Sequence, residues 1–199
     1  MLIQYEDKCL LERVISGGQT GADQAGLYSA EACRFKTGGH APKGYRTLAG
    51  NNPTMLRDHF GLEETVQENY QYRTALNVQN SDATIRLASD FQSPGELCTL
   101  RAITKFKKPY FDVDLRPLMR NKMQYLSGRA DRNAYIQKTT DAILAFLIDH
   151  QVVTLNIAGN ADRNSTDGFG EHFHSASEVL IDLFTKVRNK NESLQRLSA

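Results

Sequence analysis

Short apolar runs alternate with segments of helical periodicity along most of this chain. Arg13-Val-Ile-Ser16 is typical of a short buried strand that runs into glycines, and residues 81–88 alternate apolar and polar side chains as a strand does. The expected strands are 13–16, 62–66, 81–88, 109–113 and 152–158, and the expected helices begin at Gly21 and cover 70–78, 97–106, 133–150 and 175–187. Strands that alternate with helices favour right-handed parallel crossovers. The pattern therefore predicts an α/β fold: a Rossmann-like, open, mainly parallel sheet with helices on both faces, in three layers.

Glycine and proline interrupt this alternation once. Gly38, Gly39, Pro42 and Gly44 break regular elements, so residues 37–53 are expected to be mostly loop. No shift in composition separates two cores, and 199 residues are enough for one large domain. We therefore expect a single Rossmann-like domain at 13–188, an N-terminal extension at 1–12 and a C-terminal tail at 189–199.

Charge and cysteine content argue against several classes of protein. The 24 Lys and Arg residues nearly balance the 23 Asp and Glu residues, so the basic excess of nucleic-acid binders is missing. No apolar stretch is long enough to span a membrane, and residues 1–10 lack the order of a signal peptide. Cys9, Cys33 and Cys98 are odd in number and too widely spaced for a disulfide framework or a CxxC metal site. We expect a cytoplasmic protein without a nucleic-acid or membrane partner.

The loop after the first strand has the features of an anion-binding turn. Two glycines let backbone amides approach a ligand, and a helix that begins near Gly21 would direct free N–H groups and its positive dipole end at an anion. The loop residues expected to bind are Gly17, Gly18, Gln19, Thr20, Gly21 and Asp23. The spacing is neither GxGxxG nor that of a P-loop, so a standard dinucleotide or ATP site is not predicted. The alternative is a tight strand–helix turn that binds nothing.

Two further strand ends carry similar sequences. Ser93-Pro-Gly-Glu-Leu-Cys-Thr99 precedes a helix and offers Ser93, Gly95, Glu96 and Thr99 to a ligand, while Asn156 and Gly159 follow the last strand. The carboxylate of Glu96 would repel phosphate but suits a ribose, a base edge or a metal. Its plain alternative is an acid that stabilises the first turn of the helix. Because ligands lie outside the carboxyl ends of parallel strands, these loops are expected to share one pocket.

A polar stretch and one loop lysine complete the predicted site. Arg73, Asn77 and Asp82 lead into a buried strand; Arg73 would clamp a phosphate and Asp82 would orient it, unless the two form only a structural pair. Lys43 either closes over the anion or is an ordinary surface lysine. His172 and His174 resemble a metal pair, but residues two apart on a helix point to different faces, so no metal site is predicted. No Ser–His–Asp order or HExxH motif is evident.

Several whole peptides carry a family resemblance. They are Val14-Ile-Ser-Gly-Gly-Gln-Thr-Gly-Ala-Asp23, Ala41-Pro-Lys-Gly44, Tyr72-Arg-Thr74, Asn77-Val78, Ser81-Asp-Ala-Thr84 and Leu155-Asn-Ile-Ala-Gly159. On these residues the chain resembles the putative molybdenum cofactor carrier family, part of the LOG-type, lysine-decarboxylase-like Rossmann superfamily. The resemblance implies a Rossmann-like sheet, a homo-oligomer (dimer or tetramer), and a nucleotide-like or pterin-phosphate ligand. The word carrier in the family's name was assigned by relationship to other proteins and does not describe a demonstrated activity.

The second loop departs from the patterns that the resemblance implies. Related enzymes cleave the N-riboside bond of nucleotides through a PGGxGTxxE motif, of which Pro94, Gly95 and Thr99 remain. Ala102 stands where the catalytic glutamate is expected, so the group that would assist cleavage is absent. Residues 1–12 extend the family pattern, and the segment 115–151 is longer than usual. Either of these two additions would suit an interface or a pocket cover.

The sequence leads to three hypotheses for function. The leading one is a binding or carrier protein for a phosphate-bearing nucleotide-derived or molybdopterin-type ligand, with molybdenum cofactor or a nucleotide as the anionic small molecule. The second is a hydrolase or transferase acting on an N-glycosidic or phosphate bond, with Glu96 and Arg73 as candidate catalytic residues. The third is a nucleotide sensor or protein-interaction module. Replacement of the superfamily's acid by Ala102 favours binding over catalysis.

Overall fold

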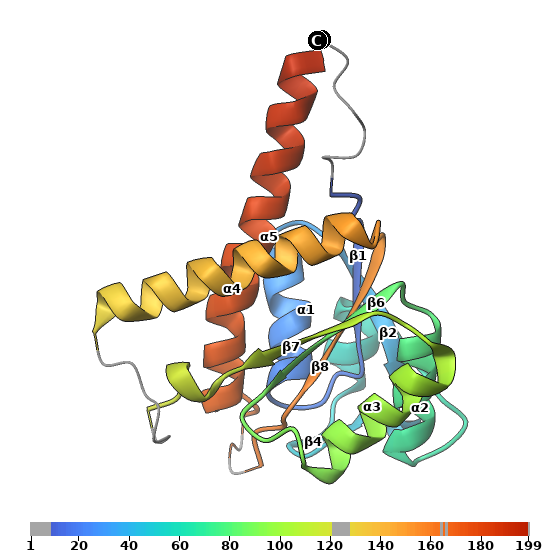
Figure 1. The fold of residues 1–199 in the computed structure, drawn as a ribbon. Helices are drawn as coiled ribbons and strands as arrows, with labels where there is room; N and C mark the ends of the chain where they lie inside the picture. Colours follow the sequence, from blue (N-terminus) through green and yellow to red (C-terminus); the bar gives the residue numbers. More distant parts are fainter. Residues whose placement is uncertain (1–8, 121–127, 164, 166, 199) are drawn as a thin grey trace.

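A six-stranded parallel sheet forms the centre of the molecule (Figure 1). The computed structural model describes residues 9–120, 128–163, 165 and 167–198. The strand order is β5-β2-β1-β8-β6-β7, and every neighbouring pair is parallel. The strands are β1 (Arg13–Ser16), β2 (Lys36–Ala41), β5 (Leu62–Glu64), β6 (Ala83–Ala88), β7 (Tyr110–Asp114) and β8 (Thr154–Gly159); β3 (Arg46–Thr47) and β4 (Gly50–Asn51) form a separate antiparallel pair. The predicted Rossmann-like fold is confirmed.

The α-helices of the described residues cover the two faces of this sheet. They are α1 (Ala22–Ala32), α2 (Tyr70–Gln79), α3 (Pro94–Phe106), α4 (Arg129–Asp149) and α5 (Glu171–Ser198). Helix α5 packs against α1 and α4, whereas α2 and α3 pack against each other (Figure 1). The main core lies under the first group and includes Val14, Ile85, Ile157, Leu180 and Phe184. No helix in the described part of the chain is both long and apolar enough to cross a membrane.

The order of the strands places a crevice at the centre of the sheet. The chain runs outward from β1 through β2 to β5 on one side and from β6 to β7 on the other. The last strand, β8, fills the gap between β1 and β6, with Ile15 beside Asn156 and Ile85 beside Ile157. Connections on the two sides of such a point leave on opposite faces, so the loops separate outside the carboxyl ends of the strands. The ends of β1, β6 and β8 therefore meet at one opening.

The structure corrects the prediction that residues 37–53 are mostly loop. Residues 36–41 form β2, the strand next to β1, and only a short 3-10 turn (Lys43–Tyr45) and the β3–β4 pair follow. Gly39 has φ 120°, and a Cβ there would overlap the backbone of Ser16. Here glycine permits two strands to approach closely rather than breaking one. Helix α5 is also longer than predicted, since residues 189–198 continue it.

Candidate binding cleft

A cleft of about 1310 Å³ opens at the carboxyl ends of β1, β6 and β8. Its walls come from the loop before α1, the start of α2, the first turns of α3, the segment after β8 and the first turn of α5. The predicted site residues that line it are Gln19, Asp23, Arg73, Ser93, Gly95, Glu96, Thr99 and Gly159. The loops that the sequence singled out at three strand ends thus contribute to one cavity.

The loop before α1 contributes side chains to this cleft. Gly18 and Gly21 have φ values of 71° and 86°, which residues with a Cβ rarely adopt. The amide of Gln19 donates to Asp23 Oδ2 (3.2 Å), that of Thr20 to Gln19 Oε1 (2.9 Å), and that of Gly21 to the Gly168 carbonyl (3.3 Å). Because these three amides bind protein acceptors, the expectation that they cradle an anion directly does not describe this structure. Gln19 and Asp23 line the cleft through their side chains.

Arg73 crosses from α2 to this loop. Its Nη1 lies 3.1 Å from Asp23 Oδ2, and its guanidinium lies against Gly17, where a Cβ would overlap it. Burial raises the pKa of the Asp23 carboxyl, although Arg73 and the amide of Gln19 act in the opposite direction. Arg73 Nε is buried and has no hydrogen-bond partner among the described residues. One donor of a nearly buried guanidinium is therefore left unsatisfied next to Gly17.

The predicted pairing of Arg73 with Asp82 is wrong. Asp82 lies at the amino ends of the strands, where its Oδ2 accepts from the amides of Val153 (3.0 Å) and Thr154 (2.7 Å). Asp82 precedes β6, whereas the cleft lies beyond the carboxyl end of that strand. The carboxylate therefore joins two strands and does not orient a ligand in this cleft.

Lys43, Asn77 and Asn156 also lie outside the lining of the cleft, as do Gly17, Gly18, Thr20 and Gly21 of the first loop. Asn77 bonds the backbone of His40, accepting from its amide (2.8 Å) and donating to its carbonyl (3.1 Å). Asn156 donates to Thr84 Oγ1 (3.2 Å) within the sheet, and Lys43 is exposed in the turn after β2. These side chains connect elements or face solvent, so the predicted site is smaller than the sequence suggested.

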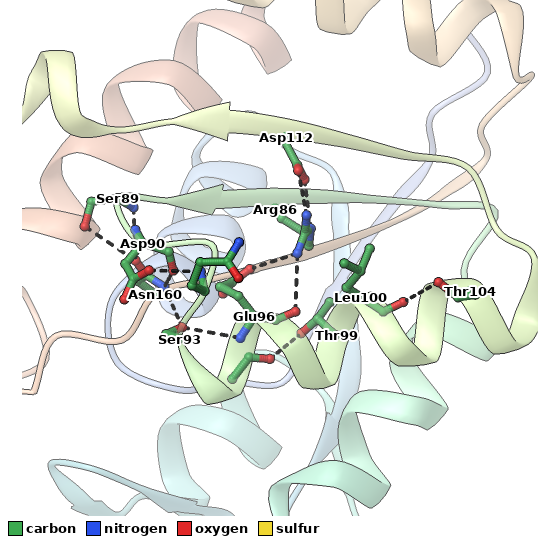
Figure 2. A network of polar contacts seen from close by, with 12 residues as sticks. Arg86, Ser89, Asp90, Ser93, Glu96, Thr99, Leu100, Thr104, Asp112 and Asn160 are labelled. Carbon is green, nitrogen blue, oxygen red and sulfur yellow. Dashed lines mark hydrogen bonds and ion pairs between the residues drawn. The ribbon is translucent and has the colours of Figure 1, made fainter.

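Glu96 lies in the first turn of α3, buried beside Arg86 of β6 (Figure 2). Its Oε2 is 3.8 Å from Arg86 Nη1 and accepts no hydrogen bond from the described residues. Arg86 instead binds Asp112 through two bonds of 2.8 and 2.5 Å and donates to the Glu96 carbonyl. Burial, and to a smaller extent the charges of Asp23 and Asp112, raise the pKa of Glu96 to about 7 against the opposing effect of Arg86. The carboxyl that was expected to repel an anion thus carries a proton part of the time near neutral pH.

Asn160 is a central residue that the sequence analysis missed. Its Oδ1 accepts from the amides of Ser89 (3.0 Å) and Asp90 (2.9 Å), and its Nδ2 donates to the Asp90 carbonyl (3.1 Å) and Ser93 Oγ (3.3 Å) (Figure 2). Ser93 in turn caps α3 by accepting from the Glu96 amide. One amide side chain therefore holds the ends of β6 and β8 and the start of α3 together. It directly follows the Asn156–Gly159 peptide, in which the sequence predicted two binding residues.

The two histidines near the start of α5 point to different places, as expected for residues two apart on a helix. His172 lines the cleft and contacts Ser89 and Asp162, whereas His174 lines a separate groove of about 690 Å³ between α4 and α5. Among the described residues, no group of three or more His, Cys, Asp or Glu side chains is placed to hold a metal ion. Ala102, at the position of the superfamily's acid, is buried with Val78 and Ile103.

The comparisons with known proteins agree with this architecture. A family model described as the circularly permutated YpsA SLOG family matches residues 14–176. The crystal structure of a putative molybdenum carrier protein from Syntrophus aciditrophicus SB is similar, with a TM-score of 0.70 and 27% sequence identity over 90% of this chain and 98% of that one. No curated protein matches.

The strand order gives the permutation a structural meaning. If β8 is counted first, the two halves of the sheet run outward from it in sequence order, through β1, β2 and β5 on one side and β6 and β7 on the other. In this chain that central strand comes last, as it would if the chain had been opened between β8 and β1. The resemblance to the molybdenum carrier family and its LOG-type superfamily is confirmed, and the chain belongs to the circularly permutated YpsA SLOG family.

Proposed function

We propose that this protein binds and carries a phosphate-bearing, nucleotide-derived or molybdopterin-type molecule in the cleft. The observation that carries the proposal is the Arg73 guanidinium, which lines the cleft, is nearly buried and pairs with one carboxylate, that of Asp23, among the described residues. A guanidinium has five N–H donors, so those that Asp23 does not use are available to an anionic oxygen in the cleft. The similar protein from Syntrophus aciditrophicus is called a molybdenum carrier, which supports a ligand-holding role.

The remaining lining suits a ligand that has both an anionic group and several hydrogen-bonding groups. Arg46 and Arg163 line the cleft together with Arg73 and add positive charge. The raised pKa values of Asp23 and Glu96 reduce the repulsion that two carboxylates would exert on a phosphate. An ionised carboxylate can accept hydrogen bonds from ribose hydroxyls or pterin N–H groups, and a protonated carboxyl can also donate one to a ribose oxygen. A homo-oligomer and a cytoplasmic location stay predictions from the sequence.

Isothermal titration with AMP, ADP-ribose, cyclic nucleotides and isolated molybdenum cofactor tests this proposal. We expect one or more of these to bind, and Arg73→Gln to weaken binding about 30-fold, since a hydrogen bond to a charged group contributes roughly 2 kcal/mol. Arg57→Gln is the matched control, because Arg57 also pairs with an aspartate but is exposed and does not line the cleft. Absence of binding by a well-folded sample, or equal affinity of the two variants, would contradict the proposal.

The same samples distinguish a carrier from a nucleotide hydrolase. A hydrolase that uses Glu96 as its acid is favoured by the burial of this carboxyl and its pKa of about 7. Chromatography of the titrated mixtures for free base and ribose phosphate would reveal turnover. A carrier returns its ligand intact, whereas release of base that disappears in Glu96→Gln would replace the carrier proposal with the hydrolase.

A further inference from the structure

Three side chains from three separate elements form a hydrogen-bonded chain along the cleft. Ser89 follows β6, Asp162 follows β8, and His172 belongs to the first turn of α5. Ser89 Oγ lies 2.9 Å from His172 Nε2, and His172 Nδ1 lies 2.9 Å from Asp162 Oδ1. All three residues line the cleft. This is the arrangement of a nucleophile, a base and a carboxylate that orients the base.

The carboxylate at one end of this chain is held firmly. Asp162 Oδ1 also accepts from the amide of His172 (3.0 Å), and Oδ2 accepts from the amide of Phe173 (3.0 Å). Burial acts to raise the pKa of Asp162, but the hydrogen bonds from the His172 ring and from these two amides outweigh it and hold the pKa below its usual range. An ionised Asp162 fixes the proton of the imidazole on Nδ1, which leaves the lone pair of Nε2 facing Ser89.

Capping of α5 does not account for the whole arrangement. The two backbone bonds from His172 and Phe173 already satisfy the cap, and they do not require an imidazole at position 172. The contact between the His172 ring and Ser89 is additional, and it joins a helix to the end of a strand 83 positions away in sequence. The Ser89 side chain is partly exposed to the cleft, so a ligand can reach its hydroxyl.

We propose that Ser89 and His172 are catalytic residues that hydrolyse a carboxylic ester of a small polar molecule, with Asp162 as a positioning residue. In the first step His172 Nε2 takes the Ser89 proton while Oγ bonds to the ester carbonyl carbon. The alkoxide then leaves with the electron pair of the broken C–O bond and takes the proton from Nε2. Water repeats the sequence: it gives a proton to Nε2, attacks the acyl-serine, and releases the carboxylic acid as Oγ regains its proton.

The surroundings of Ser89 favour charge development on the ester oxygen. Ser93, Pro94 and Gly95, at the start of α3, line the same cleft, and Asn160 links Ser93 to the amide of Ser89. The positive end of the α3 dipole and the amide of Gly95 therefore lie on the serine's side of the cleft, whereas the amides of Glu96 and Leu97 donate to Ser93. Preorganised dipoles of this kind stabilise an oxyanion.

Hydrolysis of p-nitrophenyl acetate and butyrate, with labelling by a fluorophosphonate probe, tests the proposal. We expect the probe to label Ser89, identified by peptide mass spectrometry, and Ser89→Ala and His172→Gln to lower kcat/KM at least about 1000-fold. Ser165→Ala is the matched control, since Ser165 lines the same cleft but bonds Asp167 instead of a histidine. The proposal is overturned if wild type neither reacts nor hydrolyses the esters, or if Ser89→Ala matches Ser165→Ala.

Asp162→Asn separates positioning from folding. Asparagine keeps only one of the two oxygens that accept from the α5 amides, so we expect a fall of the thermal midpoint that is small beside the loss of kcat/KM. The pH profile of kcat/KM shifts as well, because the imidazole loses its anionic partner. An unchanged pH profile and rate would show that Asp162 only caps α5. These assays need no anionic ligand, so a negative result would not contradict the proposed carrier function. In the same way, a failure of the ligand titrations would not contradict the proposed ester hydrolysis.

Discussion

Two buried arginines near the cleft differ in how completely the protein satisfies them. Arg86 makes two bonds to Asp112 and one to the Glu96 carbonyl, and its guanidinium lies 5.2 Å from the ring centre of Phe91 and 5.3 Å from that of Tyr110. Arg73 is nearly as buried but pairs with a single carboxylate, that of Asp23, and leaves Nε without a partner in the described structure. The first arginine joins β6, β7 and α3, whereas the second lines the cleft with fewer partners, namely Asp23 and the ring of Tyr70, whose centre is 5.9 Å away.

This difference separates a structural charge from a binding charge. A buried ion that is fully hydrogen-bonded stabilises the fold through its partners. When the ion is removed, those partners stay buried without their hydrogen bonds, which destabilises the folded state. A buried ion that keeps an unused donor forms fewer hydrogen bonds within the protein, so it contributes more to the binding of a ligand than to the stability of the fold. If the comparison holds, variants of Arg86 lose mainly stability and variants of Arg73 lose mainly ligand affinity.

Arg86→Gln gives the largest expected effect. Removing the guanidinium leaves Glu96 buried without its nearest cation and breaks both bonds to Asp112, so we expect the free energy of unfolding to fall by about 4 kcal/mol. Urea denaturation followed by circular dichroism measures the loss. Arg116→Gln is the control, because Arg116 also pairs with an aspartate, Asp114, but is half exposed. An equal loss of stability in the two variants would contradict the structural role that the comparison gives to Arg86.

Glu96→Gln sharpens the comparison through pH. The pKa of Glu96 is raised from 4.5 to about 7, so between these values the folded protein keeps a proton that the unfolded chain releases. Its contribution to stability is therefore full below pH 4.5 and is lost as the pH rises to about 7, by up to roughly 3 kcal/mol. We expect the glutamine variant to lack this decline. Urea denaturation from pH 4 to 8 measures it, with the exposed cleft residue Glu68 changed to Gln as control. Parallel curves for wild type and Glu96→Gln would show that Glu96 titrates normally.

The sequence predicted the regular elements better than the contacts between them. The strand at 81–88 and the loops at Gly17 and Ser93 follow from local chemistry, namely periodicity, glycine and a helix cap. Strand β2 was missed because glycines that break most strands here permit close approach to β1. Asp23 rather than Asp82 meets Arg73 because α2 lies over the first loop, an arrangement that sequence spacing does not encode. The meeting of Ser89, Asp162 and His172 likewise depends on three strand and helix ends that only the folded sheet brings together.

Gly17→Ala gives the smallest effect, and it tests how Arg73 is held. An added Cβ would overlap the Arg73 guanidinium, which can move because it is the end of a flexible side chain. We expect a loss of about 1 kcal/mol in stability, from overpacking at a mobile group, and a several-fold loss of affinity for the ligand identified by titration. Gly95→Ala is the matched control: Gly95 lines the same cleft, but a Cβ there meets no atom of the described residues within 4 Å, and alanine favours the helix. Equal affinities of the two alanine variants would mean that the position of the Arg73 guanidinium does not control binding, and the contrast with Arg86 would then rest on stability alone.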